Sequence, residues 1–199
     1  MSVGVIEKVG VRARSERAPD PVAHLVERCQ EGDPDAFCEL FERHVGGVQR
    51  HLTLLIGPGN EVDDLVQLVF LNVFQSIGRF CGKSAFSTWL FRITINVARQ
   101  EIRSRTRQRR LTGAVSDVAE MRGTAVHETP ENRLATWQRV YEVLDRLTFK
   151  KRETFILYMY EGYSLEEIAR LLGSSVSTIG SRLQAARREI VRMLEARER

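Results

Sequence analysis

Cysteine is scarce in this chain, and its cysteines form no motif. Cys29, Cys38 and Cys81 are scattered along the sequence and include no Cys-x-x-Cys spacing. An odd, scattered set argues against a disulfide framework and against a zinc site, and the four histidines form no ligand motif either. We therefore expect reduced thiols in a cytoplasmic protein, with no metal and no cofactor.

Long apolar runs are also missing. No stretch approaches the roughly 18 consecutive apolar residues of a membrane-spanning helix, and charged side chains interrupt residues 1–19, where a signal peptide would need an apolar core. There is no convincing alternation of apolar and polar residues between hairpin turns, which would indicate strands. The sequence predicts an all-α protein that does not insert into membranes.

The overall composition fits a soluble helical protein in which basic residues outnumber acidic ones. The chain has 199 residues, 43% of them hydrophobic, which allows one medium domain or two small ones. Lys and Arg number 30 against 26 Asp and Glu, giving a net charge of +4. This excess mildly favours a polyanionic partner.

The composition changes twice along the chain. Residues 1–19 have many charges and little apolar periodicity, which indicates a flexible tail. Residues 111–136 contain glycines, a proline and four acidic residues against two arginines, a net charge of −2 that is typical of a mildly acidic linker. The predicted organisation is a tail at 1–19, a first helical domain at 20–108, a linker at 109–134 and a second helical domain at 135–199.

Three helix starts are marked by a capping side chain followed by proline. They are Asp20-Pro21, Asp33-Pro34 and Thr129-Pro130. Proline at the first helical position loses no hydrogen bond, because that N–H has no partner within the helix. The first two helices are expected to bury Val22, Leu25, Val26 and Cys29, and then Phe37, Leu40, Phe41, Val45, Val48 and Leu52.

The third helix has the most regular apolar stripe. Its predicted core residues follow i, i+3, i+4, i+7 spacing and are Val62, Leu65, Val66, Val69, Phe70, Val73, Phe74 and Ile77. Leu68 and Leu71 lie off this stripe, on the side that carries Asp63, Asp64 and Gln67. Two interpretations remain open: isolated surface leucines, or an exposed apolar patch that docks a partner protein.

The fourth helix combines an apolar face with a row of basic residues. The predicted buried face consists of Phe86, Trp89, Leu90, Ile93 and Val97. Another face carries Arg92, Asn96, Arg99 and Arg103, at i, i+4, i+7 and i+11. Residues 99–110 hold six arginines and one glutamate, a net charge of +5. Such a face suits contacts with phosphates and base edges, although a solvated helix end is the simpler alternative.

The loop before this helix places two aromatic residues beside the basic face. It runs from Phe80 through Lys83 and Ser84 to Phe86. Aromatic rings combined with cations are what unstacked, single-stranded bases require. The alternative is that these phenylalanines belong to the core.

The second half contains the pattern of a helix-turn-helix. A pair of helices with Trp137, Val140, Leu144, Leu147, Phe155, Ile156 and Met159 at apolar positions comes first. A capping box of Ser164 and Glu167 then starts a short helix that ends at Gly173. After the turn 174–176, a second helix over 177–194 is expected to enter the DNA major groove. Its apolar residues are Ile179, Leu183, Ala186, Ile190 and Leu194.

Two segments resemble those of bacterial extracytoplasmic-function (ECF) sigma factors, the small members of the sigma-70 family. The first is Asp63-Asp64-Leu65-Val66-Gln67 with Phe70-Leu71 and Phe74, continued by Phe86-Ser87-Thr88-Trp89-Leu90-Phe91-Arg92-Ile93 and Asn96-Val97-Ala98. The second is Gly162-Tyr163-Ser164-Leu165-Glu166-Glu167-Ile168-Ala169 with Thr178, Ser181-Arg182-Leu183 and Ala186-Arg187. The resemblance covers residues 22–197.

The resemblance implies a transcription initiation factor rather than an enzyme, with roles for the features described above. Its region 2 would dock on a coiled coil of the largest subunit of core RNA polymerase, through Asp63, Asp64, Gln67 and Leu71, to which we add Leu68 because it lies off the apolar stripe. The same region would melt and read the promoter −10 element through Phe80, Lys83, Ser84, Phe86, Trp89, Arg92, Asn96, Arg99 and Arg103. Its region 4 would touch the polymerase flap and read the −35 element through Ser177, Thr178, Ser181, Arg182, Gln184, Arg187 and Arg188.

The resemblance further implies an anti-sigma factor as a partner, and an acidic linker that occupies the RNA path. The sequence departs from the family pattern at three positions. Leu68 stands where a Glu commonly follows the docking Gln, and Gly180 and Ala185 stand where the recognition helix often carries Arg or Lys.

Two other functions compete with the sigma-factor interpretation. An autonomous helix-turn-helix regulator would need a dimer surface, and the sequence has no long heptad segment to supply one. A metal-dependent nuclease would rest on Asp63 and Asp64, but adjacent carboxylates on a helix point about 100° apart and make a poor metal clamp. Neither alternative accounts for the aromatic loop.

Overall fold

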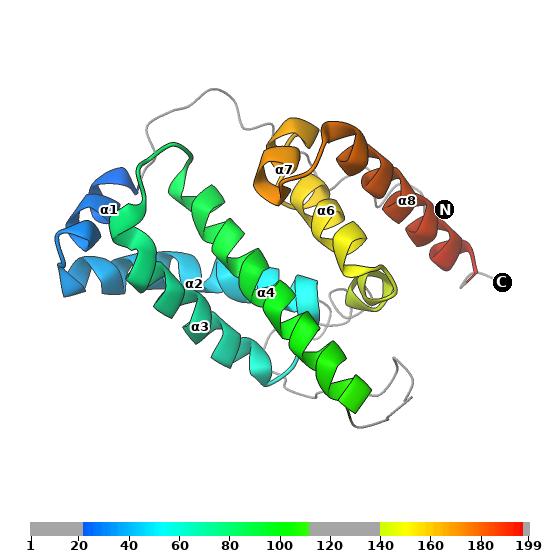
Figure 1. Cartoon of the computed structure of the whole chain (residues 1–199), viewed down its shortest axis with the longest axis horizontal. Helices are drawn as coiled ribbons and strands as arrows, with labels where there is room; N and C mark the ends of the chain where they lie inside the picture. Colours follow the sequence, from blue (N-terminus) through cyan, green and yellow to red (C-terminus); the bar gives the residue numbers. More distant parts are fainter. Residues whose placement is uncertain (1–21, 112–139, 197–199) are drawn as a thin grey trace. The chain divides into compact units, whose positions relative to one another are not determined.

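The computed structural model describes residues 22–111 and 140–196, and every regular element in these two ranges is a helix. The all-α prediction is confirmed. The chain separates into two compact units, one on each side of residues 112–139 (Figure 1). The predicted tail, residues 112–134 of the predicted linker, the caps at Asp20 and Thr129, and Trp137 lie outside the described residues.

The first unit is built around the long helix over residues 34–56. It contains α1 (Ala23–Gln30), α2 (Pro34–Ile56), α3 (Glu61–Ser76), the 3-10 turn η2 (Ile77–Arg79) and α4 (Phe86–Leu111). α2 packs against α1, α3 and α4, and α3 also packs against α4. α4 extends three residues beyond the predicted end of the first domain at 108.

The start of α2 follows its sequence signal. The Asp33 side chain accepts hydrogen bonds from the backbone N–H groups of Asp35 and Ala36, and Pro34 occupies the first helical position. Asp33 also binds Arg28 of α1, with Nη2 at 2.6 Å from Oδ2. The same carboxylate therefore caps α2 and joins it to α1.

Most of the predicted core of the first unit is buried. All four residues predicted for α1 and seven of the eight predicted for the third helix are buried. The exception is Phe74, which is 63% exposed, and Phe41 of α2 is also at the surface, at 36%. The prediction that these two rings are buried is wrong. Phe41 of α2 and Phe74 of α3 lie at the open edge between the two helices, which no other helix described for residues 22–111 covers.

α4 buries more of its surface than one apolar stripe. Phe86, Leu90 and Val97 are buried as predicted, but Trp89 and Ile93 are only half-buried. Phe91, Thr94, Ile95 and Ala98 are buried although the pattern did not predict it. The reason is that α4 contacts both α2 and α3, so two of its sides face protein.

The second unit begins with helical residues 140–145 and continues with α6 (Phe149–Met159), α7 (Leu165–Leu172) and α8 (Val176–Glu195). α8 packs against both α6 and α7. The capping box at Ser164 and Glu167 is confirmed, and Gly173 ends α7 in the left-handed conformation at φ 62°. Leu144, Leu147 and Ile156 are buried as predicted, but Val140 is 40% exposed.

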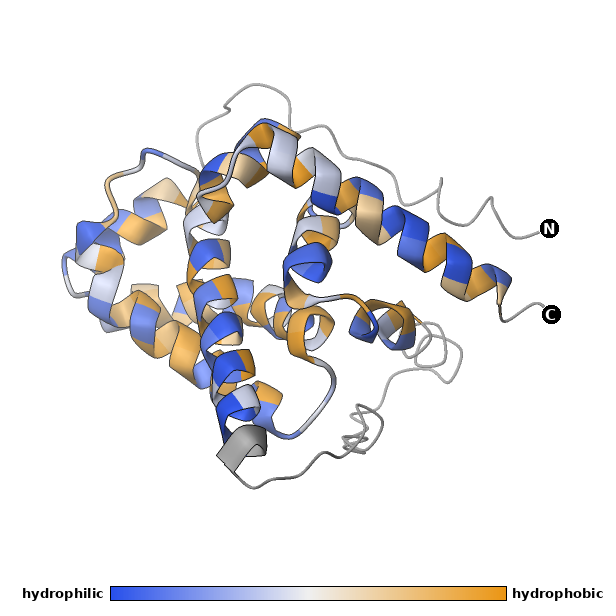
Figure 2. Cartoon of the chain, turned by 45° about the vertical axis from the view of Figure 1, so that its right-hand side comes forward, coloured by the Kyte–Doolittle hydropathy of each residue, from blue (hydrophilic) through white to orange (hydrophobic). Residues whose placement is uncertain are grey.

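The second helix of the helix-turn-helix starts one residue earlier than predicted. Ser175, rather than Val176, is the last turn residue, because its side chain accepts a hydrogen bond from the Thr178 N–H and caps α8. Ile179, Leu183, Ala186 and Ile190 are buried as expected. Apolar and polar residues alternate around the helices (Figure 2), and no helix in the described ranges is long and apolar enough to cross a membrane.

Candidate functional site

An open apolar groove lies on the first unit between α2 and α3. Leu68, Leu71 and Phe74 line it and are 37%, 51% and 63% exposed. Its full lining is Phe37, Phe41, Asp64, Gln67, Leu68, Phe70, Leu71 and Phe74. Four of the five predicted docking residues therefore gather in one place, whereas Asp63 is turned toward α2 and accepts a hydrogen bond from Gln49 at 3.3 Å.

The groove contains four phenylalanines that the sequence pattern assigned to the core. The Phe74 ring meets Phe37 edge-on at 5.1 Å between centroids, and Phe41 meets Phe70 at 4.6 Å. A signal for Phe74 was present in the sequence. At about 100° per residue it lies on the edge of the α3 stripe that adjoins Gln67 and Leu71.

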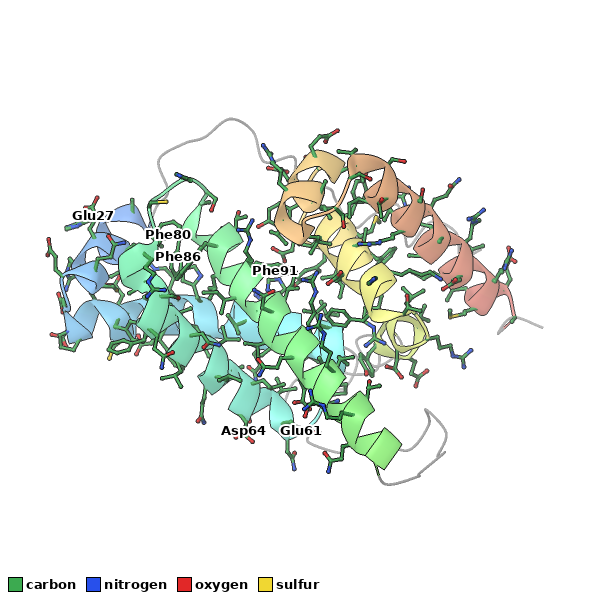
Figure 3. All side chains as sticks on the ribbon, in the orientation of Figure 1. Glu27, Glu61, Asp64, Phe80, Phe86 and Phe91 are labelled. Carbon is green, nitrogen blue, oxygen red and sulfur yellow. The ribbon has the colours of Figure 1, made fainter. Side chains whose placement is uncertain are left out.

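The loop before α4 is supported by an aromatic cluster. Phe80 lies 5.2 Å from Trp89 and 5.8 Å from Phe86 between ring centroids, and His44 of α2 lies 5.2 Å from Phe86. Figure 3 shows Phe80 and Phe86 together at the start of α4. Lys83 is exposed at the tip of the loop, and Ser84 is half-buried.

Phe86 does not present its ring to solvent. Its exposed fraction is 0%, so the predicted direct contact between Phe86 and DNA is wrong for this arrangement. The Phe86 ring packs against Phe80, Trp89 and His44 and so supports the loop from the protein interior. Phe80 and Trp89, both half-buried, keep part of their surface available for stacking.

The polar face of α4 forms a shallow basic depression. Asn96, Arg99 and Arg103 line it together, as their spacing predicted. The remaining lining residues are Gln100, Ser104 and Arg107, and none of the six is acidic. Arg92 is exposed on the same helix but lies outside the depression.

One arginine of this basic segment serves the fold instead. The guanidinium of Arg105 lies 2.6 Å from Glu101 and 3.5 Å from Glu61 of α3, with Nη1 3.5 Å from the backbone carbonyl of Ile56. Figure 3 labels Glu61 at the start of α3. Arg105 therefore fixes the second half of α4 to the rest of the unit, whereas Asn96, Arg99 and Arg103 line the depression.

The predicted reading face of α8 is exposed. The exposed members are Ser177, Thr178, Ser181, Gln184, Arg187 and Arg188. Arg182 is half-buried, and its Nη1 lies 3.5 Å from Ser174 Oγ in the turn. Arg187 lies over the Tyr158 ring of α6, with the guanidinium carbon 5.2 Å from the centroid. Because Arg187 also contacts Met159, it is partly engaged within its own unit.

A buried polar network joins helical residues 140–145 to α6, in the unit that contains the helix-turn-helix. Arg152 is 5% exposed and donates from Nη2 to the Asp145 carbonyl at 2.8 Å and to the Asp145 carboxylate at 3.0 Å. Tyr141 donates to the same carboxylate at 3.1 Å. Burial, reinforced by the charge of Asp145, raises the pKa of Tyr141 to about 12. These bonds fix the turn between residues 140–145 and α6.

No cluster of titratable groups in the described ranges suggests metal chemistry. Within residues 22–111 and 140–196, no three His, Cys, Asp or Glu side chains are placed to hold a metal ion. Among the described residues, only Asp33 has a clearly lowered carboxyl pKa, held down by the Ala36 N–H and by Arg28, and this carboxylate belongs to a helix cap. The described parts of the chain thus expose an apolar groove, a basic helix face and a helix-turn-helix.

Comparison with known proteins matches both units to one family. Residues 40–108 match the family model "Sigma-70 region 2", and residues 137–190 match "Sigma-70, region 4". The chain is 33% identical over 173 residues to the ECF RNA polymerase sigma-E factor of Haemophilus influenzae, covering 83% of this chain and 91% of the relative. It is 33% identical over 183 residues to the protein of the same name from Escherichia coli K12, covering 88% and 94%.

Solved structures agree with the sequence comparison. CnrH, solved in complex with the cytosolic domain of CnrY, is 25% identical, with a TM-score of 0.63 over 87% of this chain and 96% of that one. The sigma factor RpoE of Bartonella quintana, solved with the anti-sigma factor NepR, has a TM-score of 0.67 at 24% identity, over 80% and 96% of the two chains. The chain belongs to the ECF sigma factors of the sigma-70 family.

Proposed function

We propose that each of the two units recognises one element of a promoter, and that the first unit also binds core RNA polymerase. Residues 20–108 act as region 2 and residues 135–199 as region 4, joined by a linker at 109–134. The observation that carries this proposal is the apolar groove between α2 and α3. A chain of this size gains nothing in stability from exposing Leu68, Leu71 and Phe74 together, so the groove is best explained by a protein partner.

In this proposal the groove receives the coiled coil of the largest polymerase subunit. Leu71 and Phe74 supply apolar contact, while Asp64 and Gln67 on the same lining supply polar contacts at the rim. Leu68 stands where a Glu is common in the family, so in this proposal the chain makes an apolar contact at that position. Asp63 takes part indirectly, through its hydrogen bond with Gln49.

The −10 element is opened and held by the loop and by α4. Phe80 and Trp89 offer ring surface to unstacked bases, and Lys83 and Ser84 lie between them in sequence. Asn96 has both a donor and an acceptor and can read a base edge, whereas Arg92, Arg99 and Arg103 carry charges suited to the backbone. The absence of acidic side chains from the α4 depression supports this division.

The −35 element is read by α8 in the major groove. Ser177, Thr178 and Ser181 lie near its N-terminal end, where a recognition helix meets base edges. Arg182 and Gln184 follow on the next turn, and Arg188 lies further along, toward flanking phosphates. The region 4 unit also touches the polymerase flap in this proposal.

An anti-sigma factor is the second protein partner that we propose. RpoE of Bartonella quintana was solved with one, and it shares the fold of this chain. An inhibitor that covers the groove of α2 and α3 would compete directly with polymerase for Leu71 and Phe74. The protein is proposed to act in the cytoplasm, where polymerase and promoter are found.

The decisive experiment is transcription in vitro on genomic fragments, with core polymerase in the presence or absence of this protein. We expect new transcripts only when both are present, and start sites that share −10 and −35 sequences. A gel shift on the same promoters without polymerase separates the alternative function. Strong, specific binding by the protein alone, with no transcript from the mixture, would indicate an autonomous helix-turn-helix regulator.

A further inference from the structure

Gln30 reaches across the first unit to the start of the loop that precedes α4. Its side-chain nitrogen Nε2 donates to the carbonyl of Ile77 at 2.9 Å and to the carbonyl of Phe80 at 2.7 Å. Gln30 is the last residue of α1, and its two acceptors lie 47 and 50 residues further along the chain. One amide group thus binds both ends of the short segment from Ile77 to Phe80.

This segment is where the helical backbone stops and the loop begins. Phe80 donates its backbone N–H to the Ile77 carbonyl at 3.0 Å, which closes the last turn of η2. Phe80 itself is extended, with φ −71° and ψ 117°. An extended residue after a helix end turns its carbonyl away from the helical ladder. Gln30 supplies that carbonyl with a donor and so caps η2 from outside.

Phe80 is also the residue through which the loop contacts the aromatic cluster of Phe86 and Trp89. Its ring contacts Trp89 at 5.2 Å and Phe86 at 5.8 Å between centroids. Holding the Phe80 backbone therefore limits where this ring and the loop beyond it can lie. Trp89 is half-buried beside Phe80, and the Phe80 ring covers one side of the Trp89 side chain.

The donor side of this contact is well anchored. Leu25, Val26 and Cys29 bury one face of α1, and the preceding section of the helix is tied to α2 by the ion pair of Arg28 with Asp33. α1 also packs directly against η2. Gln30 thus extends from a fixed helix to the segment where the loop begins.

We infer that Gln30 is a positioning residue for −10 strand capture. Its amide presets the loop so that Phe80 and Trp89 already face the incoming non-template strand. This inference rests on the proposed role of the loop in holding unstacked bases. It assigns to α1 a part in promoter opening, although α1 itself touches neither DNA nor polymerase in the proposal.

The test uses two variants of the full chain and one control. Gln30→Met keeps the length of the side chain and removes both donated hydrogen bonds. Gln30→Glu replaces the donor by a carboxylate that is repelled by the two carbonyl oxygens. Ala23→Glu, at an exposed position on the same helix, adds the same charge without touching the loop.

A spectroscopic measurement follows the loop without DNA. In a Trp137→Phe background Trp89 is the single tryptophan, and its emission reports the aromatic cluster. We expect Gln30→Met and Gln30→Glu to shift Trp89 emission well below the melting temperature, and Ala23→Glu to leave it unchanged. Unchanged emission in both Gln30 variants would overturn the inference.

Binding to a single strand provides the functional measurement. Holoenzyme is titrated with a fluorescent oligonucleotide that carries the non-template −10 sequence of a promoter it transcribes. Losing two hydrogen bonds at a partly exposed site should weaken this binding by roughly threefold to tenfold, with assembly of holoenzyme unaffected. A parallel loss of polymerase binding would mean a merely structural role and would also overturn the inference.

The two hypotheses fail in different ways. If wild-type holoenzyme does not bind the oligonucleotide, the proposed function of the loop is wrong, whatever Gln30 does. If the wild type binds and Gln30→Met binds equally well, only the positioning role is wrong.

Discussion

The guanidinium of Arg187 lies over the Tyr158 ring, 5.2 Å from its centroid, and thereby joins the predicted recognition helix α8 to α6. Its Nη2 also lies 3.5 Å from Met159 Sδ. A second link between the same helices is the ion pair of Lys151 with Glu189. These contacts fix the rotation of α8 about its axis, which decides the residues that α8 would present to DNA in the proposed function.

Arg182 and Arg188 should consequently differ in what they contribute to −35 recognition. Arg182 lies in the N-terminal half of α8 beside the turn, whereas Arg188 is exposed six residues further on. We expect Arg182→Ala to change the preference among −35 variants, because a bidentate base contact discriminates by about 1–3 kcal/mol. Arg188→Ala should weaken all variants alike and reduce the salt slope by about one unit.

The measurement is transcription or binding on a set of −35 variants at two salt concentrations. Arg187→Ala provides the comparison, since it removes a contact within the protein as well as a charge. If Arg182→Ala lowers activity equally on every −35 variant, Arg182 contacts the backbone and this division is wrong.

The exposed leucines of α3 should be needed for polymerase binding but not for folding. Leu68→Lys and Leu71→Lys each place a charge in the apolar groove, which should weaken association with core polymerase at least tenfold. Since both side chains are well exposed, the melting temperature should change little. Affinity is measured by titrating labelled protein with core polymerase, and stability by thermal unfolding.

Ala23→Lys adds the same charge to an exposed site of α1 and serves as the control. A collapse of the melting temperature in Leu68→Lys would mean that Leu68 belongs to the core. Polymerase binding equal to that of the control would show that the groove has another partner.

Periodicity predicted which helices form and most of what they bury, but not where a buried stripe ends. Val69 and Val73 lie in the middle of the α3 stripe and are fully buried, while Phe74 at its edge is exposed. Whether an edge residue is covered depends on where the neighbouring helix lies, and the local pattern holds no information about that. Phe91 shows the reverse case, since its burial follows from the second helix packed against α4.

The candidate site was predictable where it follows a repeat within one helix. Asn96, Arg99 and Arg103 share a face because their spacing requires it. The contact of Gln30 with Ile77 and Phe80 was not predictable, because it joins segments about 50 residues apart and uses an amide with no distinctive sequence pattern. The burial of Phe86 was predicted from the apolar face of α4, but its contact with His44 of α2 was not, because that contact joins two helices.

Asn96 and Lys83 should contribute to strand opening more than to initial binding. Asn96→Ala and Lys83→Ala remove groups at the surface, unlike Phe86→Ala, which would leave a cavity in the core. We expect both to slow open-complex formation on duplex promoters more than on promoters with a pre-melted bubble. The rate is followed by permanganate footprinting. Equal losses on the two templates would contradict a role specific to melting.

Gly180 should be replaceable by alanine with a gain in stability. A Cβ at this position would lie 4.0 Å from Leu165 Cδ1, an ordinary contact, and the residue is inside a regular helix. Gly180→Ala should raise the free energy of unfolding by up to about 1 kcal/mol, because alanine has the higher helix propensity. Gly173→Ala is the matched control and should destabilise, since Gly173 has φ 62°. Denaturant unfolding followed by circular dichroism measures both. Destabilisation by Gly180→Ala would indicate a tighter approach to α7 than the geometry gives.

Asp33 should make the first unit sensitive to acid. The Ala36 N–H, together with the Arg28 guanidinium, lowers the pKa of Asp33 in the folded state below its ordinary value of 3.8. Its stabilising effect is therefore complete above that value and is lost as the pH falls through the folded-state pKa. Asp33→Asn can still cap α2 but cannot pair with Arg28. We expect it to melt at a lower temperature than the wild type at pH 7, with the difference shrinking below about pH 4. Melting is followed by Trp89 emission in the Trp137→Phe background, with Asp35→Asn as the control for charge. A difference that stays constant down to pH 2 would show that the charge of Asp33 does not contribute.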